Sequence, residues 1–421
     1  MFDFMEMDFN GPNQQTETSG PYIPDAAECL RCGMCVSSCP TFRLFETDEE
    51  TPRKRIRSIA KLLQNDAITE DERMHLDNCL QCRACESACP SRMAYGQLFD
   101  RAQALVAKRP HWLARLGFYL IEHKRRRNRL LPLLRLYLKS GLQKPLRQSG
   151  LLKKLGLAEA EALLGSPALQ PLAETHASHF DRRGKVALFT GCIAEAFDRE
   201  TLSATIELLN ALGYDVVVPP GQVCCGAIHQ HNGQSAKALI NTNMTVFNAL
   251  DVDAVIYTAT GCGAMLNEYS NDDTEASESF RQRLYDINDF LLAHWPDQLE
   301  LAPSDSRVAV HEPCSQRNVL KNQAAVYRLL EKVPGLSVTP LPDNPICCGA
   351  GGSYMLTHPD NATRLRESKC RAIRESRVDR IVSSNFGCAI FISTDSDKIV
   401  HPLVLLAGQL PSDTGDTAVD L

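Results

Sequence analysis

The sequence lacks the features that mark several large classes of protein. No apolar run approaches the ~20 residues that a membrane-spanning helix needs. Residues 1–10 are acidic and have neither the basic start nor the apolar centre of a secretory signal. The net charge of −6 gives no indication of a nucleic-acid partner. We therefore expect a cytoplasmic protein that does not bind nucleic acid.

The sequence also lacks the common signatures of nucleotide binding and of catalysis. No strand-like run is followed by GxGxxG, the fingerprint of a fold that binds NAD or FAD. No Ser/His/Asp or Cys/His/Asn arrangement stands out. We therefore assign no catalytic residue to this chain.

Cysteine, in contrast, is abundant, with 17 residues in a chain of 421. In a reducing cytoplasm such a number favours metal ligation over disulfide bonds. The length allows about two or three domains of ~100–200 residues each. A hydrophobic content of 44% and a charged content of 23% are ordinary for a soluble globular protein.

Eight cysteines fall in two copies of one pattern, "CLRCGMCVSSCP" at 29–40 and "CLQCRACESACP" at 79–90. Each copy is C-x2-C-x2-C-x3-C-P, the spacing of bacterial ferredoxins that bind [4Fe–4S] clusters. Three thiolates of one run reach three corners of a cluster, and the fourth ligates the other cluster. Structural zinc is the alternative, but zinc sites normally use two CxxC pairs held far apart. We therefore predict two [4Fe–4S] clusters, one held by Cys29, Cys32, Cys35 and Cys89, the other by Cys79, Cys82, Cys85 and Cys39.

The segment between the two runs has helical signals. Thr51-Pro52 fits an N-cap and a first helical position, followed by an apolar face that includes Ile56 and Ile59. Thr69 and Glu72 form a capping-box pattern before a second short helix. We therefore predict an all-helical cluster domain, which resembles the α-helical ferredoxin domains of respiratory dehydrogenase subunits.

The middle of the chain is strongly basic. Residues 101–154 contain 15 Lys or Arg and one acid, Glu122, with a peak at "HKRRRNR" from 123 to 129. Basic amphipathic helices of this type lie on anionic membrane surfaces or dock acidic partners. We take Arg125, Arg126 and Arg127 as one surface patch. If this segment binds a membrane, we expect the protein to be peripheral on the cytoplasmic face of the inner membrane. The alternative is a solvated helical linker, and 155–183 has the composition of a linker.

The second half of the chain repeats itself. "KVALFTGC", "VCCG" and "IYTATGCG" recur as "RVAVHEPC", "ICCG" and "IVSSNFGC", at offsets of 122, 123 and 126 residues. Strand-like runs alternate with helical patterns, which predicts a parallel sheet with covering helices in each copy. Every repeated cysteine follows a strand, where open α/β sheets bind ligands. The repeated cysteines are Cys192, Cys224, Cys225 and Cys262 in the first copy and Cys314, Cys347, Cys348 and Cys388 in the second.

These repeats, which we call CCG units, predict a further iron–sulfur cluster or a soft metal ion, with buried inert thiols as the alternative. They resemble the CCG domain of heterodisulfide reductase subunits, in which another cysteine closes a final CxxC. Here Met265 and Phe391 occupy the closing positions, which puts that family's non-cubane cluster in doubt. Cys370 has no counterpart and is expected in the core. His229, His231 and His311 lie near CCG cysteines, and we expect solvated loop histidines, with tuning of a bound group as the alternative.

The predicted fold class is α+β and multidomain, with an all-helical two-cluster ferredoxin domain followed by two duplicated α/β CCG units. The predicted boundaries are a flexible N-terminus at 1–24, the ferredoxin domain at 25–105, a basic helical connector at 106–183, CCG units at 184–300 and 301–408, and a flexible tail at 409–421.

The combination of paired ferredoxin runs, basic connector and two CCG units ending in "GCGAM" and "GC" resembles the iron–sulfur subunit of bacterial glycolate oxidase. The resemblance covers about Tyr22 to Leu410. It implies separate FAD-binding subunits that oxidise glycolate to glyoxylate, while this chain passes electrons towards quinone. Subunits of lactate utilisation and of anaerobic glycerol-3-phosphate dehydrogenase share the layout.

Two other interpretations stay open at this point. The likeness to heterodisulfide reductase suggests a thiol–disulfide enzyme that uses the CCG units directly, although the missing closing cysteines argue against it. A non-catalytic metal-binding scaffold is the other. We favour a relay role for the CCG units, because the sequence supplies no arginine pair and histidine base there for oxidation of a 2-hydroxy acid.

Overall fold

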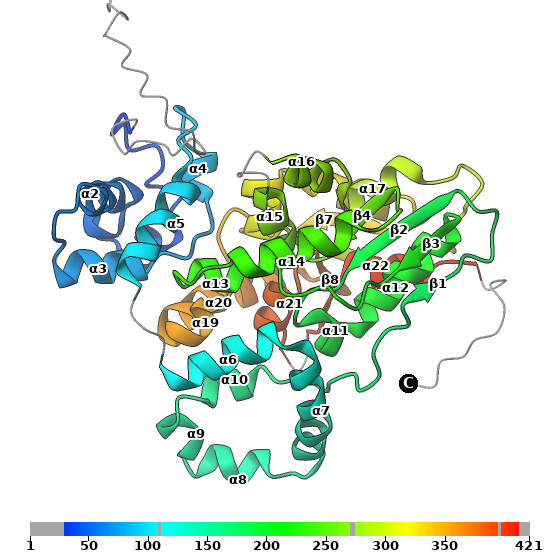
Figure 1. The fold of residues 1–421 in the computed structure, drawn as a ribbon, viewed down its shortest axis with the longest axis horizontal. Coiled ribbons are helices and arrows are strands. Elements are labelled where there is room, and N and C mark those ends of the chain that lie inside the picture. Colours follow the sequence, from blue (N-terminus) through cyan, green and yellow to red (C-terminus); the bar gives the residue numbers. More distant parts are fainter. Residues whose placement is uncertain (1–28, 108–110, 270–273, 395–396, 412–421) are drawn as a thin grey trace, which may run out of the picture.

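The structure is a computed structural model that describes residues 29–107, 111–269, 274–394 and 397–411. The predicted flexible segment 1–24 and most of 409–421 lie outside the described residues. Figure 1 shows a helical N-terminal domain beside a larger α/β body, with a ring of linker helices below the body. In the described part of the chain, no helix is both long enough and apolar enough to cross a membrane.

The regular elements within residues 29–107 are all helices, as predicted, and loops and turns join them. Both predicted helix starts are confirmed. Thr51 is the N-cap of α2 with Pro52 in its first turn, and Thr69 and Glu72 form the capping box of α3. Ile59 and Leu98 are fully buried where α2 packs on α5. The elements are α1 (Pro40–Phe45), η2 (Asp48–Glu50), α2 (Pro52–Leu63), α3 (Glu70–Asp77), α4 (Ala84–Ser87) and α5 (Tyr95–Val106).

The basic segment forms a chain of short helices: α6 (Trp112–Glu122), α7 (Lys124–Lys139), α8 (Gln143–Gln148), α9 (Leu151–Lys154) and α10 (Ala158–Ala162). In Figure 1 they form an open ring on one side of the α/β body. Within 155–183, α10 continues this chain of helices, and β1 (Thr175–His176) pairs antiparallel with a strand of the first CCG unit.

Each CCG unit is built on its own sheet, and the two sheets have the same strand arrangement apart from the additional edge strand β1 of the first. The first sheet has the order β1-β3-β2-β4-β5 and the second β7-β6-β8-β9. All pairings except that of β1 are parallel, as predicted. The strands are β2 (Gly184–Phe189), β3 (Tyr214–Val217), β4 (Ala254–Tyr257), β5 (Leu284–Asp286), β6 (Arg307–His311), β7 (Ser337–Pro340), β8 (Arg380–Ser383) and β9 (Ile399–Val400).

Helices cover both sheets and join them into one body. α12 packs on α22 and α17 on α18, so one apolar core contains buried residues of both units. The first unit contains α11 (Ala194–Phe197), α12 (Arg199–Ala211), α13 (Ala227–His231), α14 (Lys237–Asn248), α15 (Thr260–Asn267), α16 (Glu275–Gln282) and α17 (Ile287–His294). The second contains the π-helix η4 (Ser315–Leu320), α18 (Gln323–Leu330), α19 (Tyr354–Thr357), α20 (Pro359–Ser376), α21 (Phe386–Ile392) and α22 (Pro402–Ala407).

Candidate metal and cluster sites

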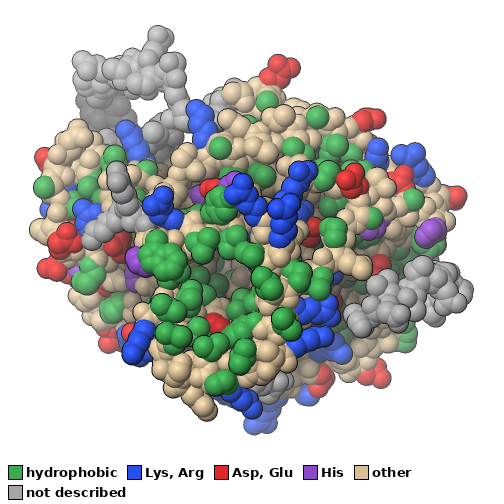
Figure 2. All heavy atoms as spheres, turned by 60° about the horizontal axis from the view of Figure 1, so that its bottom comes forward, with side chains coloured by type: hydrophobic (Ala, Val, Ile, Leu, Met, Phe, Trp, Pro, Cys, Tyr) green, Lys and Arg blue, Asp and Glu red, His purple; other side chains and the backbone are tan. Residues whose placement is uncertain are grey.

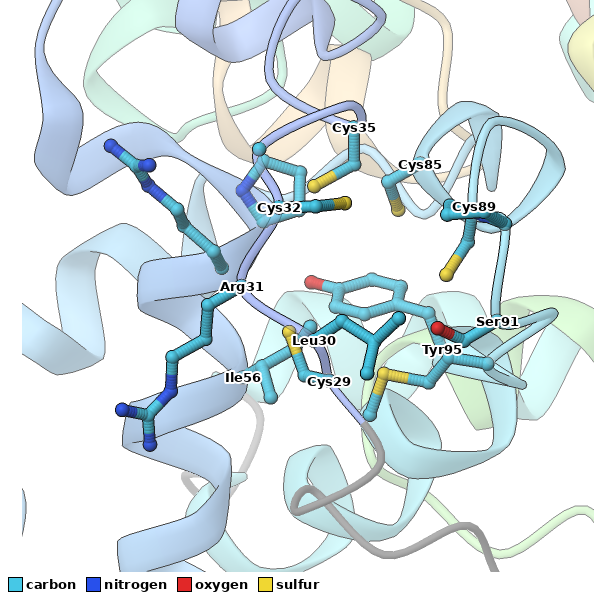
Figure 3. A pocket seen from close by; sticks show the side chains of 15 residues that line it. Cys29, Leu30, Arg31, Cys32, Cys35, Ile56, Cys85, Cys89, Ser91 and Tyr95 are labelled. Carbon is cyan, nitrogen blue, oxygen red and sulfur yellow. The ribbon is translucent and has the colours of Figure 1, made fainter. Parts of the chain in front are cut away.

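The first pocket of the ferredoxin domain opens to solvent. Its cysteines are Cys29, Cys32, Cys35, Cys85 and Cys89. Figure 3 shows them arranged around the ring of Tyr95, which comes from the start of α5. Cys32 is exposed, and the neighbouring Leu30 and Met34 are 71% and 59% exposed. The pocket therefore lies where a partner protein could reach it.

The second pocket lies deeper and contains Cys39, Cys79, Cys82 and Cys85. Cys39 is the N-cap of α1, and Pro40 starts the helix that leads away from it. The structure thus brings Cys89 to the three early cysteines of the first run, and Cys39 to those of the second. Cys85 and Tyr95 line both pockets, and the Tyr95 hydroxyl lies 3.7 Å from the sulfur of Cys79.

Arg55 of α2 is a buried cation beside the second pocket. Its Nη1 donates to the sulfur of Cys39 at 3.7 Å, and its Nε donates to the carbonyl of His75 at 2.6 Å. Its other guanidinium nitrogen forms an ion pair with Glu50, and both side chains are 2% exposed. Sequence analysis missed Arg55, because its neighbours in "PRKRIR" are chemically similar and only packing distinguishes it.

The donor set of these pockets fits iron–sulfur ligation. All seventeen cysteines are free thiols, although they lie in groups. Burial raises the pKa of Cys79, Cys82 and Cys85, and it raises that of Cys35 to about 11. A thiolate at such a position needs positive charge beside it, and metal binding supplies that charge as the thiol proton leaves. Two sets of four soft sulfur donors are what [4Fe–4S] clusters require.

The four cysteines of the first CCG unit meet at the carboxyl ends of β2, β3 and β4. The thiol of Cys192 lies beside that of Cys224, the thiol of Cys224 beside that of Cys225, and the thiol of Cys225 beside that of Cys262. The linker reaches this group through Arg127 of α7, which donates to the carbonyl of Cys192. Arg127 is 7% exposed, so its assignment to a surface patch with Arg125 and Arg126 is wrong. A basic run marks which residues are charged, but not which one turns inward.

The second CCG unit gathers its cysteines with a histidine. The sulfurs of Cys348 and Cys388 are 3.2 Å apart, and a ring nitrogen of His311 lies within 4.8 Å of both. Hydrogen bonds from Cys314 and Cys348 hold the pKa of Cys347 well below its ordinary value. Lys369 of α20 is fully buried near these thiols and donates to the carbonyl of Asp343. No sequence signal distinguished Lys369 from other basic residues of its helix.

The histidines are not the solvated loop residues that the sequence suggested. His311, at the end of β6, is 2% exposed, and its Nδ1 lies 3.0 Å from the hydroxyl of Ser383. His229 is 3% exposed and contacts Glu122 of the linker at 2.8 Å. Burial lowers the pKa of His231 to about 4, and its backbone carbonyl accepts a hydrogen bond from Gln81 at 3.0 Å. His311 therefore belongs to the second CCG site. The equivalent position in the first unit is occupied by Phe189.

Three further positions that the sequence singled out, Met265, Phe391 and Cys370, are buried. Met265 and Phe391, at the closing positions of the two units, are buried in apolar clusters. Cys370 is in the core, as expected, and its thiol contacts the carbonyl of Ile392 at 3.8 Å. Each CCG site therefore has four cysteines available.

The second ferredoxin pocket adjoins the second CCG site. Asn318 of η4 donates to the carbonyl of Cys82 at 2.8 Å, and Cys82 packs on the apolar cluster that contains Cys347 and Cys348. The thiols of Cys82, Cys314 and Cys347 lie close enough to influence each other's protonation. The glycine-rich turn after Cys348 is the part of the second CCG unit that lies against the ferredoxin domain. A Cβ at Gly351 would lie 3.1 Å from Leu80.

The two CCG sites also adjoin each other. Thr260, two residues before Cys262, donates from its backbone to the carbonyl of Ser384 at 3.0 Å. Its hydroxyl accepts from Ser315, the residue after Cys314, at 2.9 Å. Asn385 donates to the sulfur of Cys388 at 3.3 Å and lies against Gly261. The segments that carry cysteines of one unit therefore pack directly on those of the other.

Comparisons with known proteins agree with this architecture. A 4Fe-4S dicluster domain matches residues 25–93, a cysteine-rich domain matches 186–267 and again 308–393, and the linker region of the glycolate oxidase iron-sulfur subunit matches 109–164. Fold and sites thus define an iron–sulfur protein with a dicluster ferredoxin domain and a duplicated cysteine-rich unit.

Similar proteins identify the family. The probable glycolate oxidase iron-sulfur subunit of Bacillus subtilis is 35% identical over 86% of this chain and 87% of its own length. The glycolate oxidase iron-sulfur subunit of Escherichia coli is 29% identical over 87% of this chain and 89% of its own. Lactate utilization protein A of Geobacillus kaustophilus is 30% identical over 52% of this chain and 94% of its own. The chain belongs to the family of glycolate oxidase iron–sulfur subunits.

Proposed function

We propose that this chain is the electron-carrying subunit of a glycolate oxidase complex. A partner subunit with bound FAD would oxidise glycolate to glyoxylate, and this chain would pass the electrons towards a quinone. One observation carries the proposal. The cysteine sites form a contiguous series, from the solvent-open first pocket through the second pocket to the second and then the first CCG unit.

Glycolate is favoured over other hydroxy acids by the extent of similarity. Relatives named for glycolate oxidase match along at least 86% of the chain, whereas the lactate utilization relative matches 52%. The linker match points in the same direction, because its description names glycolate oxidase. Lactate or glycerol-3-phosphate oxidation stays the alternative substrate assignment.

The overall reaction balances in electrons and protons. Oxidation of glycolate to glyoxylate releases two electrons and two protons, and reduction of a quinone to its quinol consumes two of each. Iron–sulfur clusters, when bound, supply one-electron carriers between these two-electron reactions. The chain's own residues contribute the positions of the carriers and their separation from water. The complex would work in the cytoplasm, in peripheral contact with the membrane that holds the quinone.

The ligand sets follow from the pockets. Cys29, Cys32, Cys35 and Cys89 would hold the first [4Fe–4S] cluster, and Cys39, Cys79, Cys82 and Cys85 the second. In the CCG units, Cys192, Cys224, Cys225 and Cys262, and Cys314, Cys347, Cys348 and Cys388, would hold a further cluster or soft metal. His311 would join the latter set as a nitrogen donor.

The test separates substrate oxidation from electron delivery. In the assembled complex, Cys225→Ser and Cys348→Ser should each lower quinone reduction at least ~10-fold, as loss of a metal-site residue typically does. Glycolate should still bleach the flavin at the wild-type rate in rapid-mixing experiments. Cys370→Ser is the matched control, because its thiol is buried but lies outside both CCG sites. Slow bleaching in a fully assembled, flavin-replete variant would contradict the relay role.

A further inference from the structure

The linker helices expose an uncovered apolar face. Of the seventeen large apolar side chains that the described part of the protein exposes, eight lie between Trp112 and Leu155. α7 contributes Leu130, Leu133 and Leu136 at successive three-residue steps, 46%, 64% and 66% exposed. Figure 2 shows hydrophobic side chains gathered around a hollow on this face, with Lys and Arg side chains around them. We call this surface, residues 112–155, the linker face.

The charge of the linker face has one sign. Eight exposed Lys and Arg side chains between Arg115 and Lys154 have no ion-pair partner among the described residues. Glu122, the segment's one acid, is turned towards His229 of the first CCG unit. The linker face therefore combines apolar and cationic side chains, with no carboxylate of its own segment to oppose an anion.

The inner side of the same helices is firmly attached to the body. Lys124 forms an ion pair with the buried Glu195, Arg127 donates to the carbonyl of Cys192, and Phe118 packs on His229 at 4.9 Å between ring centroids. Leu131 is buried on this side. α7 thus turns two cations, the buried Arg127 and the partly buried Lys124, towards the body and points three leucines outward. This reverses the usual orientation of an amphipathic surface helix, so the outer side needs another partner.

We propose that the linker face docks on an anionic lipid surface. Apolar side chains that project from an amphipathic element insert at the boundary of headgroups and acyl chains, while Lys and Arg contact anionic headgroups. Trp112, at the start of α6, is of the residue type enriched at that boundary. The face is an irregular ring joined by turns at Gly141 and Gly150, both with positive φ. Fluid lipid fills such a hollow without the matching protrusion that a protein partner would need.

The proposal rests on the proposed function in one respect. A quinone acceptor dissolves in the bilayer, and docking through the linker face would hold the first CCG site, which contacts α6 and α7 from inside, next to that bilayer. Vesicle binding itself requires no turnover. Failure of docking and failure of electron transfer are therefore separately measurable.

The experiment measures co-sedimentation of the cluster-loaded full chain with vesicles of phosphatidylglycerol and phosphatidylcholine, or of phosphatidylcholine alone. Wild type should bind the anionic vesicles and leave the neutral ones largely unbound. Leu133→Glu/Leu136→Glu and Arg125→Glu/Arg126→Glu should each weaken binding at least ~10-fold at low salt. The effect of the arginine pair should fade as salt rises, because charges are screened beyond ~10 Å at 0.1 M.

Matched controls come from exposed residues elsewhere. Met74→Glu on α3 and Arg371→Glu/Arg374→Glu on α20 should bind like wild type. Cluster absorbance reports that each variant is folded. Reduction of a water-soluble short-chain quinone by the assembled complex, with glycolate as electron donor, reports that electron transfer is intact. Equal vesicle binding by all variants would overturn the proposal. So would linker-face variants that keep vesicle binding but lose the FAD subunit, since the face would then be a protein interface.

Discussion

Arg55, Arg127 and Lys369 are three buried cations that lie beside three different groups of cysteines. Arg55 is paired with Glu50, but Arg127 and Lys369 have no ion-pair partner among the described residues, and a buried charge without a partner is strongly unfavourable. Burial lowers the pKa of Lys369, and negative charge at Cys348 and Cys347 opposes that shift. Sulfur ligands that carry negative charge would therefore stabilise these cations. The residues favour thiolate-bound clusters over groups of neutral thiols.

Cys39 and Cys89 provide a test of the crossed ligand sets. Each is the last cysteine of its run and precedes a proline, so Cys39→Ala and Cys89→Ala are matched changes. Each should lower the iron content from about eight to about four atoms per chain, because each removes one ligand of one [4Fe–4S] cluster. Iron analysis and EPR of the reduced protein measure the loss.

Double variants show which cluster is affected. With crossed ligands, Cys39→Ala combined with Cys82→Ala removes two ligands of one cluster and retains about four irons. Cys39→Ala combined with Cys32→Ala disrupts both clusters and retains almost none. The reverse pattern would show that each run holds its own cluster.

At the scale of single elements, Asp286 connects β5 to α17. As the N-cap of α17, its Oδ1 accepts from the backbone and side-chain nitrogens of Asn288, both at 2.8 Å. Its Oδ2 is buried without a hydrogen-bond partner in the described structure. Burial raises the pKa of Asp286 to about 7. The folded protein therefore keeps a proton that the unfolded chain releases near its ordinary pKa of ~4.

This pKa difference predicts a pH dependence of stability. Between about pH 4 and 7 the folded state binds more protons than the unfolded state, so this carboxyl makes unfolding easier as pH rises. Asp286→Asn keeps the cap oxygen without the proton, and should reduce the fall in thermal midpoint between pH 5.5 and 7.5. Asp297→Asn, at an exposed position beyond α17, is the control. Identical pH profiles for wild type and Asp286→Asn would contradict the assignment.

At the scale of the whole molecule, few polar contacts connect the ferredoxin domain to the CCG units. Arg83, between Cys82 and Cys85, forms an ion pair with Glu268 at the end of α15. Gln230 donates to Asp100 of α5 at 2.6 Å, and Arg364 donates to the carbonyl of Leu44 at 2.7 Å. These contacts come from both CCG units, so the ferredoxin domain rests on both.

Charge reversal tests whether this interface serves electron transfer. Arg83→Glu places like charges beside Glu268 and Asp100, and should weaken the interface by about 2 kcal/mol, the value of a hydrogen bond to a charged group. Small-angle scattering should show a larger radius of gyration, and quinone reduction should slow while flavin bleaching is unchanged. Arg83→Glu/Glu268→Arg should restore both. Arg307→Glu, in an exposed pair with Asp379, is the control.

Local spacing determined much of this protein. The ferredoxin runs, the helix caps at Thr51 and Thr69, and the duplicated strand–cysteine pattern each depend on residues close in sequence. Cluster chemistry requires thiols at short fixed intervals, and capping requires a side chain three residues from its partner. Such features are readable without knowing how distant segments pack. The fold class, the duplication and the family followed from them.

Only the tertiary structure decided which distant groups meet. Arg127 and Lys369 turn inward to the CCG thiols, His311 joins Cys348 and Cys388, and Cys82 lies beside Cys347. The same structure leaves the leucines of α7 uncovered. A sequence shows that a residue is basic or apolar, but burial depends on the packing of elements that are distant in the sequence, by 65 residues for Arg127 and Cys192. The order of the relay and the linker face are consequences of that packing.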